Sequence, residues 1–166
     1  MVDTSEDGFH CEVCGKMHEG LLQDKGFRLP DDAFYLDYLD SYTRVRSNSD
    51  FCTLDESRHF LRCVLNVPLS YKSKEHFGWG FWVEVDQQGL DLALSKWDGG
   101  ADETERFMGK LANDIPGYEP LAGEPVWVKL YDDNRPLLQF PKDASHQLAK
   151  EQREGISLRR HHEIAD

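Results

Sequence analysis

The residues best suited to chemistry lie near the N-terminus, in the run Cys11-Glu-Val-Cys14-Gly15-Lys-Met-His18. Two cysteines two positions apart and followed by a glycine are typical of a zinc knuckle, in which a tight turn points both sulfur atoms at one ion. Thiolate and imidazole ligands in tetrahedral geometry select zinc. His18 is close enough in sequence to bind the same ion. The run therefore predicts a metal site that still needs a further ligand.

The remaining ligand has to come from elsewhere in the chain, and the candidates are Cys52, Cys63, His10 and His59. Cys63 alternates with apolar residues of a predicted strand, so we interpret it as a core thiol. Cys52 begins a predicted strand beside a polar run, where it could face the knuckle. We predict one zinc ion bound by Cys11, Cys14, His18 and Cys52. The alternatives are a redox Cys-x-x-Cys pair, which usually opens a helix after a strand, and two inert thiols.

Composition separates this chain from several classes of protein. Its 166 residues are 39% hydrophobic and 11% aromatic, which is enough for one domain with a real core. The net charge of −12 disfavours binding to the phosphate backbone of nucleic acids, which requires clustered Lys and Arg. The same charge suits a basic protein partner. Four cysteines are too few for a disulfide scaffold, so we expect thiols or metal ligands.

The chain also lacks several familiar signals. The first ten residues have no basic segment followed by an apolar one, and no apolar stretch approaches ~18 residues. We therefore expect a cytoplasmic protein that does not bind membranes. No His-Glu-x-x-His, Gly-x-Ser-x-Gly, P-loop or dinucleotide-binding motif occurs.

The periodicity of apolar residues predicts an α+β fold with a central, mainly antiparallel sheet, flanking helices and an N-terminal zinc knuckle. Residues 1–8 are expected to form a flexible tail, and residues 9–166 a single domain in which the knuckle, 9–20, packs on the sheet. The predicted strands are 50–54, 59–67, 78–85, 126–131 and 136–140. The predicted helices are 31–40, 90–97, 102–113, 146–154 and 157–164.

The predicted core combines one face of each central strand with a helical stripe. Its members are Leu61, Cys63, Leu65, Val67, Trp79, Phe81, Val83, Leu90, Leu94 and Trp97. Gly78 and Gly80 either let a ligand approach the strand or accommodate a neighbouring helix, and we favour packing. We interpret residues 159–162 as a solvated helix end rather than an anion patch. His146 and Glu151 are interpreted as surface residues of a helix rather than an acid–base pair.

Several blocks of this sequence resemble one known family. They are Cys11-x-x-Cys14-Gly15-x-x-His18, Asn48-Ser-Asp50-x-Cys52, Phe60-x-Arg62, Trp79-Gly80-x-Trp82-Val83, Arg135-Pro136 and the run from His146 to Ile156. In these blocks the chain resembles the bacterial domain of unknown function family 2199, from about Phe9 to Ala165. The resemblance supports the ligand set of three cysteines and His18, and it places Cys63 where the family pattern has glycine. It implies no activity.

Two functions of different classes follow from these observations. The first is a binding or regulatory protein, such as an inhibitor or immunity protein, with a structural zinc ion. The second is a zinc-dependent hydrolase, in which three protein ligands leave a coordination position for an activated water. The fourth ligand distinguishes them, because a shell closed by Cys52 has no position for that water.

Overall fold

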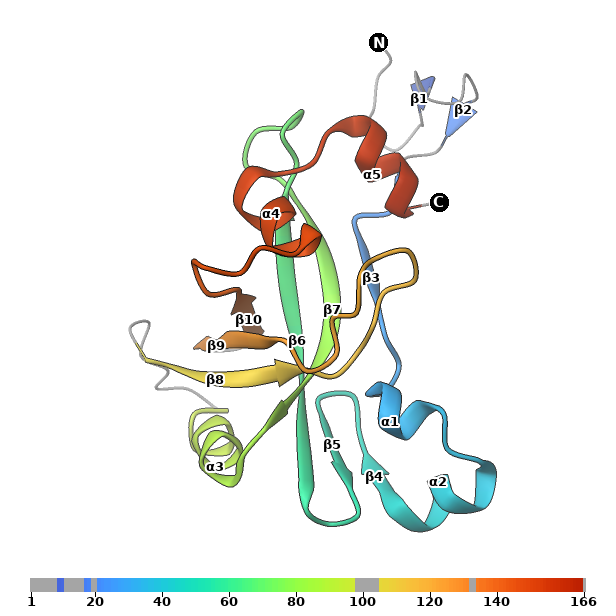
Figure 1. Cartoon of the computed structure of the whole chain (residues 1–166), viewed down its shortest axis with the longest axis vertical. Coiled ribbons are helices and arrows are strands. Elements are labelled where there is room, and N and C mark those ends of the chain that lie inside the picture. Colours follow the sequence, from blue (N-terminus) through green and yellow to red (C-terminus); the bar gives the residue numbers. More distant parts are fainter. Residues whose placement is uncertain (1–8, 11–16, 19–20, 98–104, 132–133, 166) are drawn as a thin grey trace.

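Two long neighbouring strands, β6 (Arg58–Pro68) and β7 (His76–Val85), form the centre of the fold. They pair as an antiparallel ladder that runs from His59 opposite Val85 to Pro68 opposite His76. The computed structural model describes residues 9–10, 17–18, 21–97, 105–131 and 134–165 (Figure 1). Pro68 ends β6, as predicted, because proline cannot donate a ladder hydrogen bond.

The sheet closes on itself around this ladder as a five-stranded barrel. The ladder strand β7 pairs with β8 (Arg106–Leu111), which pairs with β9 (Pro125–Tyr131), and β9 pairs with β10 (Asn134–Gln139). The barrel closes where β10 pairs in parallel with β6, with Leu137 opposite Val64. The other barrel pairings are antiparallel, which confirms a mainly antiparallel sheet.

Further strands extend the sheet beyond the barrel. The strand β3 (Asp24–Gly26) lies parallel to β7, and β5 (Phe51–Leu54) and β4 (Val45–Ser47) continue antiparallel from β6. Asp55 and Glu56, both with positive φ, turn the chain from β5 into β6, so the two strands form a hairpin. A separate two-stranded pair consists of β1 (Phe9–His10) and β2 (Met17–His18).

The barrel interior holds the main core, because side chains alternate between the two faces of each strand. Every predicted inward residue of β6 and β7 is buried, and Leu61, Leu65, Phe81 and Val83 are fully so. Cys63 is among them, which confirms its interpretation as a core thiol. Burial raises the pKa of this thiol, so it stays protonated.

Three helices cover the barrel: α3 (Gln87–Ser95), α4 (Gln147–Glu154) and α5 (Leu158–Ala165). Ser157 caps the start of α5, since its hydroxyl accepts a hydrogen bond from the Arg160 amide at 3.1 Å. Gly155 ends α4 with a φ of 83°, a conformation that favours glycine. No helix in the described part of the chain is long and apolar enough to span a membrane.

Three of the predicted helices differ from the structure in their type, their buried face or their bounds. The helix expected over 102–113 is wrong where the structure describes it, because residues 106–111 form β8 between β7 and β9. Gly109 allows this close pairing, since a Cβ there would lie 2.5 Å from Val83. The apolar face that α3 buries is narrower than predicted. Ala93 is buried, but Leu94, which was expected in the core, is 52% exposed.

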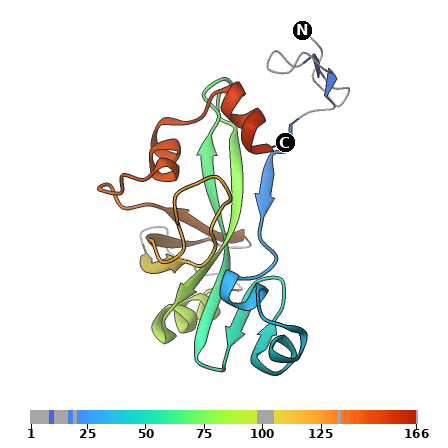
Figure 2. The same cartoon turned by 45° about the vertical axis from the view of Figure 1, so that its right-hand side comes forward.

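The helix expected over 31–40 is two short helices, α1 (Asp31–Phe34) and α2 (Tyr38–Arg44). Asp37 divides them, because its carboxylate accepts from the Asp40 amide and so begins α2. Figure 2 shows both helices beside β4 and β5, at the opposite end of the ladder from α4 and α5.

The inward face of the ladder predicts the cost of truncation. We expect Leu65→Ala and Phe81→Ala each to lower the free energy of unfolding by ~2–5 kcal/mol, because both leave cavities in a packed core. Leu94→Ala is the matched control and should cost less than ~0.5 kcal/mol. Chemical denaturation of the three variants measures this. Losses below ~1 kcal/mol at both core sites would show that the inward face is assigned wrongly.

Candidate functional site

The predicted zinc ligands fall only in part within the described residues. Cys11 and Cys14 lie outside them. His18 belongs to β2 and pairs with Phe9 of β1. The antiparallel pairing of β1 with β2 means that the segment with both cysteines joins two neighbouring strands. Within the described ranges, no three His, Cys, Asp or Glu side chains gather as a metal site requires.

Cys52 lies on the outer side of the barrel, in a small apolar cluster with Leu54, Phe60 and Trp82. It is 1% exposed, and burial raises the pKa of its thiol to about 11. A zinc ion at this sulfur would therefore have to displace a firmly held proton. Among the other candidates for the remaining zinc ligand, His59 pairs with Thr53 across the sheet. Its side chain therefore points to the opposite face of the sheet from that of Cys52.

A large apolar surface is exposed on α1 and α2. Its side chains are 50–87% exposed, although they are large and aromatic or aliphatic. We call this the α1–α2 surface; its members are Phe34, Tyr35, Tyr38, Leu39 and Tyr42. Isolated exposed apolar residues are ordinary, but a contiguous group of this size marks an interaction site.

The inner side of α1 is anchored firmly, so the exposure of its outer side is not a sign of loose packing. The Asp31 carboxylate accepts from Asn113 at 2.9 Å and from the Asp114 amide at 2.8 Å. Asn113 is fully buried and accepts in turn from the amide of Trp82 on β7. Ala33 packs beneath α1, 1% exposed.

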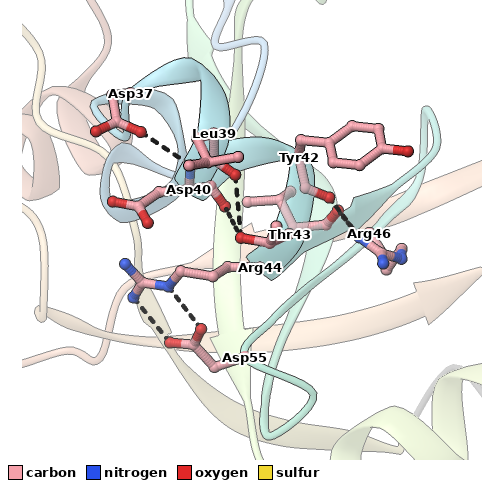
Figure 3. Close-up of polar contacts among 9 residues, drawn as sticks. Asp37, Leu39, Asp40, Tyr42, Thr43, Arg44, Arg46 and Asp55 are labelled. Carbon is pink, nitrogen blue, oxygen red and sulfur yellow. Dashed lines mark hydrogen bonds and ion pairs between the residues drawn. The ribbon is translucent and has the colours of Figure 1, made fainter.

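Polar contacts hold α2 in the same way (Figure 3). The Arg44 guanidinium donates two hydrogen bonds to the Asp55 carboxylate, at 2.7 and 2.9 Å. These bonds hold the pKa of Asp55 below its ordinary value and tie the end of α2 to the turn between β5 and β6. Arg46 donates to the Tyr42 carbonyl at 3.0 Å. These contacts tie the end of α2 to β4 and to the turn between β5 and β6, while Tyr38 and Tyr42 remain 87% and 72% exposed.

Acidic residues predominate within the segment that forms this surface, although Arg28 lies 6.0 Å from the centre of the Phe34 ring. Residues 31–42 contain four Asp and no Lys or Arg. Asp32 is compensated by Arg58 at 2.8 Å, whereas Asp37 and Asp40 lie on the other side of α2 from the Tyr42 ring (Figure 3). The sequence contained a signal for this surface, because residues 34–42 include six large apolar residues together with two Asp. The spacing of these apolar residues was interpreted as the pattern of a helix over 31–40, so the sequence analysis did not predict that they are exposed.

A second polar group lies between α4 and α5. Glu151 is 9% exposed and accepts from Tyr118 at 2.6 Å and from Arg160 at 2.7 Å. His146 accepts from the Ala149 amide at the start of α4, and burial lowers the pKa of its imidazole. The interpretation of Glu151 as a surface residue is therefore wrong, because its side chain is buried. Each of the two side chains forms its own structural contacts rather than an acid–base pair.

The interpretation of residues 159–162 as a solvated helix end is wrong for two of them. Arg160 pairs with Glu151, and His161 is 1% exposed. The His161 ring forms hydrogen bonds with the Tyr71 hydroxyl and, at 2.7 Å, with the Leu22 carbonyl. Burial lowers the pKa of His161, so the neutral ring joins α5 to the segment before β3.

Comparison with protein families identifies this chain. Residues 10–156 match the family described as an uncharacterized protein conserved in bacteria, DUF2199. The chain belongs to this family. The match spans the barrel and α4, and it confirms the resemblance found in the sequence. Comparisons with curated proteins and with solved structures give no match. The family is bacterial and uncharacterized, so membership in it assigns no activity to this chain.

Proposed function

We propose that this DUF2199 protein is a binding protein whose α1–α2 surface docks on a basic partner protein. The exposure of Phe34, Tyr35, Tyr38, Leu39 and Tyr42 carries the proposal. Tyrosine is enriched in binding hot spots, because it supplies a large apolar ring and a polar hydroxyl with few rotatable bonds. The polar contacts that anchor α1 support this role, since a preorganised surface loses little conformational entropy on binding.

Charge complementarity selects the partner. The surface shares α2 with the carboxylates of Asp37 and Asp40, on a chain with a net charge of −12. Such a surface attracts a Lys- or Arg-bearing segment and repels an acidic one. The apolar side chains then require leucine-like or aromatic residues beside the cations. An amphipathic basic segment of another protein meets both requirements.

The surface predicts binding to a basic amphipathic peptide. We expect a fluorescent helical peptide of Lys and Leu to bind with a Kd of about 1–100 µM at physiological salt. Its Glu–Leu counterpart should bind at least about tenfold more weakly, because Asp37 and Asp40 repel it. Tyr38→Ser and Leu39→Ser should each weaken binding of the basic peptide about tenfold, as hot-spot truncations do. Fluorescence anisotropy measures these affinities.

The control for the loss of any exposed apolar side chain is Leu94→Ser, which removes a leucine that is 52% exposed on α3. This variant should bind the basic peptide as the wild type does. Equal binding by Tyr38→Ser and the wild type would overturn the proposal. So would a dimer that Tyr38→Ser dissociates in sedimentation, because the occupant would then be a second copy of the chain.

We also propose that one structural zinc ion is bound by Cys11, Cys14, His18 and Cys52. The pairing of β1 with β2 supports this, because it places His18 next to the strand that leads into the segment with both knuckle cysteines. Cys52 would join this hairpin to the cluster beneath α1. A zinc ion would then stabilise the fold by closing a long loop.

The zinc site predicts the metal content of five variants. Wild-type protein purified without chelator should contain one zinc per chain by elemental analysis. Cys11→Ser, Cys14→Ser, His18→Ala and Cys52→Ser should each lose the metal and melt at a lower temperature. Cys63→Ser is the matched control and should retain it, because Cys63 lies inside the barrel. Metal-free wild type would contradict the proposal. Full zinc in Cys52→Ser would leave a position for water and favour the hydrolase instead.

A further inference from the structure

A cavity of about 520 Å³ opens on the outer side of the sheet, where β3, β6 and β7 lie side by side. It is independent of the α1–α2 surface, because the two share no residue. Its wall contains four cationic side chains and two carboxylates, although the chain as a whole is strongly acidic. The cations are Lys25, Arg62, Lys74 and Arg135, and the carboxylates are Asp24 and Glu75.

Three glycines form the floor of this cavity. The register places Gly26 opposite Gly80 and Asp24 opposite Gly78, so the sheet carries no side chain at these three glycines. The side chains of Asp24, Val64 and Asn66 lie beside Gly78. The structure thus revises the packing interpretation of Gly78 and Gly80, since they accommodate a strand and an arginine rather than a helix. A Cβ at Gly26 would lie 2.8 Å from the Arg62 guanidinium, and one at Gly80 would lie 3.3 Å from it.

Arg62 lies on this floor without an acceptor. None of its nitrogens donates a hydrogen bond within the described part of the chain, and Nε is buried. Its guanidinium lies 5.8 Å from the centre of the Trp82 ring, a contact that fixes its orientation. Because Arg62 lines the cavity, its guanidinium donors can bind an acceptor that enters there.

The charge of Arg62 is also poorly compensated. Burial and the neighbouring Arg135 lower the pKa of this guanidinium, while Asp50 acts in the opposite direction. Asp50, however, accepts from Arg135 at 3.1 Å and forms no ion pair with Arg62. A bound anion would compensate the two arginines together. The fork of an arginine matches an oxyanion that presents two oxygens.

We infer that this cavity binds a small organic anion, whose carboxylate or phosphate group lies on the glycine floor and accepts hydrogen bonds from Arg62. Arg135 and Lys25 supply further positive charge, and Asn66 supplies an amide for a polar substituent of the ligand. The volume suits a metabolite rather than a polymer. The bare floor allows the anion to approach the sheet more closely than any side chain there would permit.

Calorimetric titration with succinate, inorganic phosphate and glucose 6-phosphate tests this inference, with glucose as the uncharged control. We expect at least one of the anions to bind with a Kd below about 1 mM and glucose not to bind. Succinate and phosphate distinguish a carboxylate site from a phosphate site. Arg62→Gln should weaken binding at least about tenfold, and Arg62→Lys should recover only part of it, because lysine lacks the fork.

Two further variants make the test independent of folding defects. A Cβ at Gly78 would meet its neighbours at ordinary contact distances of 3.5 Å or more, so Gly78→Ala should fold normally and still weaken binding by raising the floor. Arg106→Gln removes the same charge from a distant strand and should leave binding unchanged. Absence of binding by all three anions, or equal binding by Arg62→Gln, Gly78→Ala and the wild type, would overturn the inference.

Discussion

The antiparallel ladder of β6 and β7 is the constraint on which the rest of the structure depends. It fixes the register of the two strands along their whole length, and strand alternation then assigns each side chain to one of two faces. The inner face fills the barrel with apolar residues. The outer face carries Phe60, Arg62, Gly78, Gly80 and Trp82, around which both proposed binding regions are built. A slip of one residue would exchange these faces.

The outer face is used differently at its two ends. Toward one end, Phe60 and Trp82 form an apolar cluster that supports α1 and contains Cys52. Past Arg62, the glycines leave the sheet uncovered, and the cavity opens above them. Trp82 belongs to both regions, since its amide binds Asn113 beneath α1 and its ring contacts Arg62. A partner protein and an anion could therefore occupy neighbouring regions supported by the same strand.

The strongest periodic patterns in the sequence correctly predicted the α+β class, the two central strands and the faces that they bury. The alternation over 59–67 and 78–85 identified the ladder and the core, because burial on one face leaves a period of two. The strand β8 was mistaken for a helix because only two of its residues, Gly109 and Leu111, are buried. The pattern within such a short strand is too weak to outweigh its helix-forming residues. Closure of the barrel by β10 and β6 is likewise a long-range pairing that no local pattern encodes.

The candidate sites were less predictable than the fold. Arg62 and the glycines were visible in the sequence, but Gly26 joins them only through the parallel pairing of β3 with β7. The exposure of Tyr38 and Leu39 depends on which side of α2 faces the sheet, and their spacing alone does not determine this. The zinc ligands remain a prediction from motif and resemblance, because Cys11 and Cys14 lie outside the described residues.

The central claim is that the ladder forms the stable core and that α2 is attached to its outside without contributing buried side chains. Native-state hydrogen exchange tests this most directly. We expect the amides of Leu61–Val67 to exchange only by global unfolding, and those of α2 to exchange at least about a hundredfold faster through local opening. Equal protection of α2 and β6 would contradict the account, because it would place the α1–α2 surface within the cooperative core.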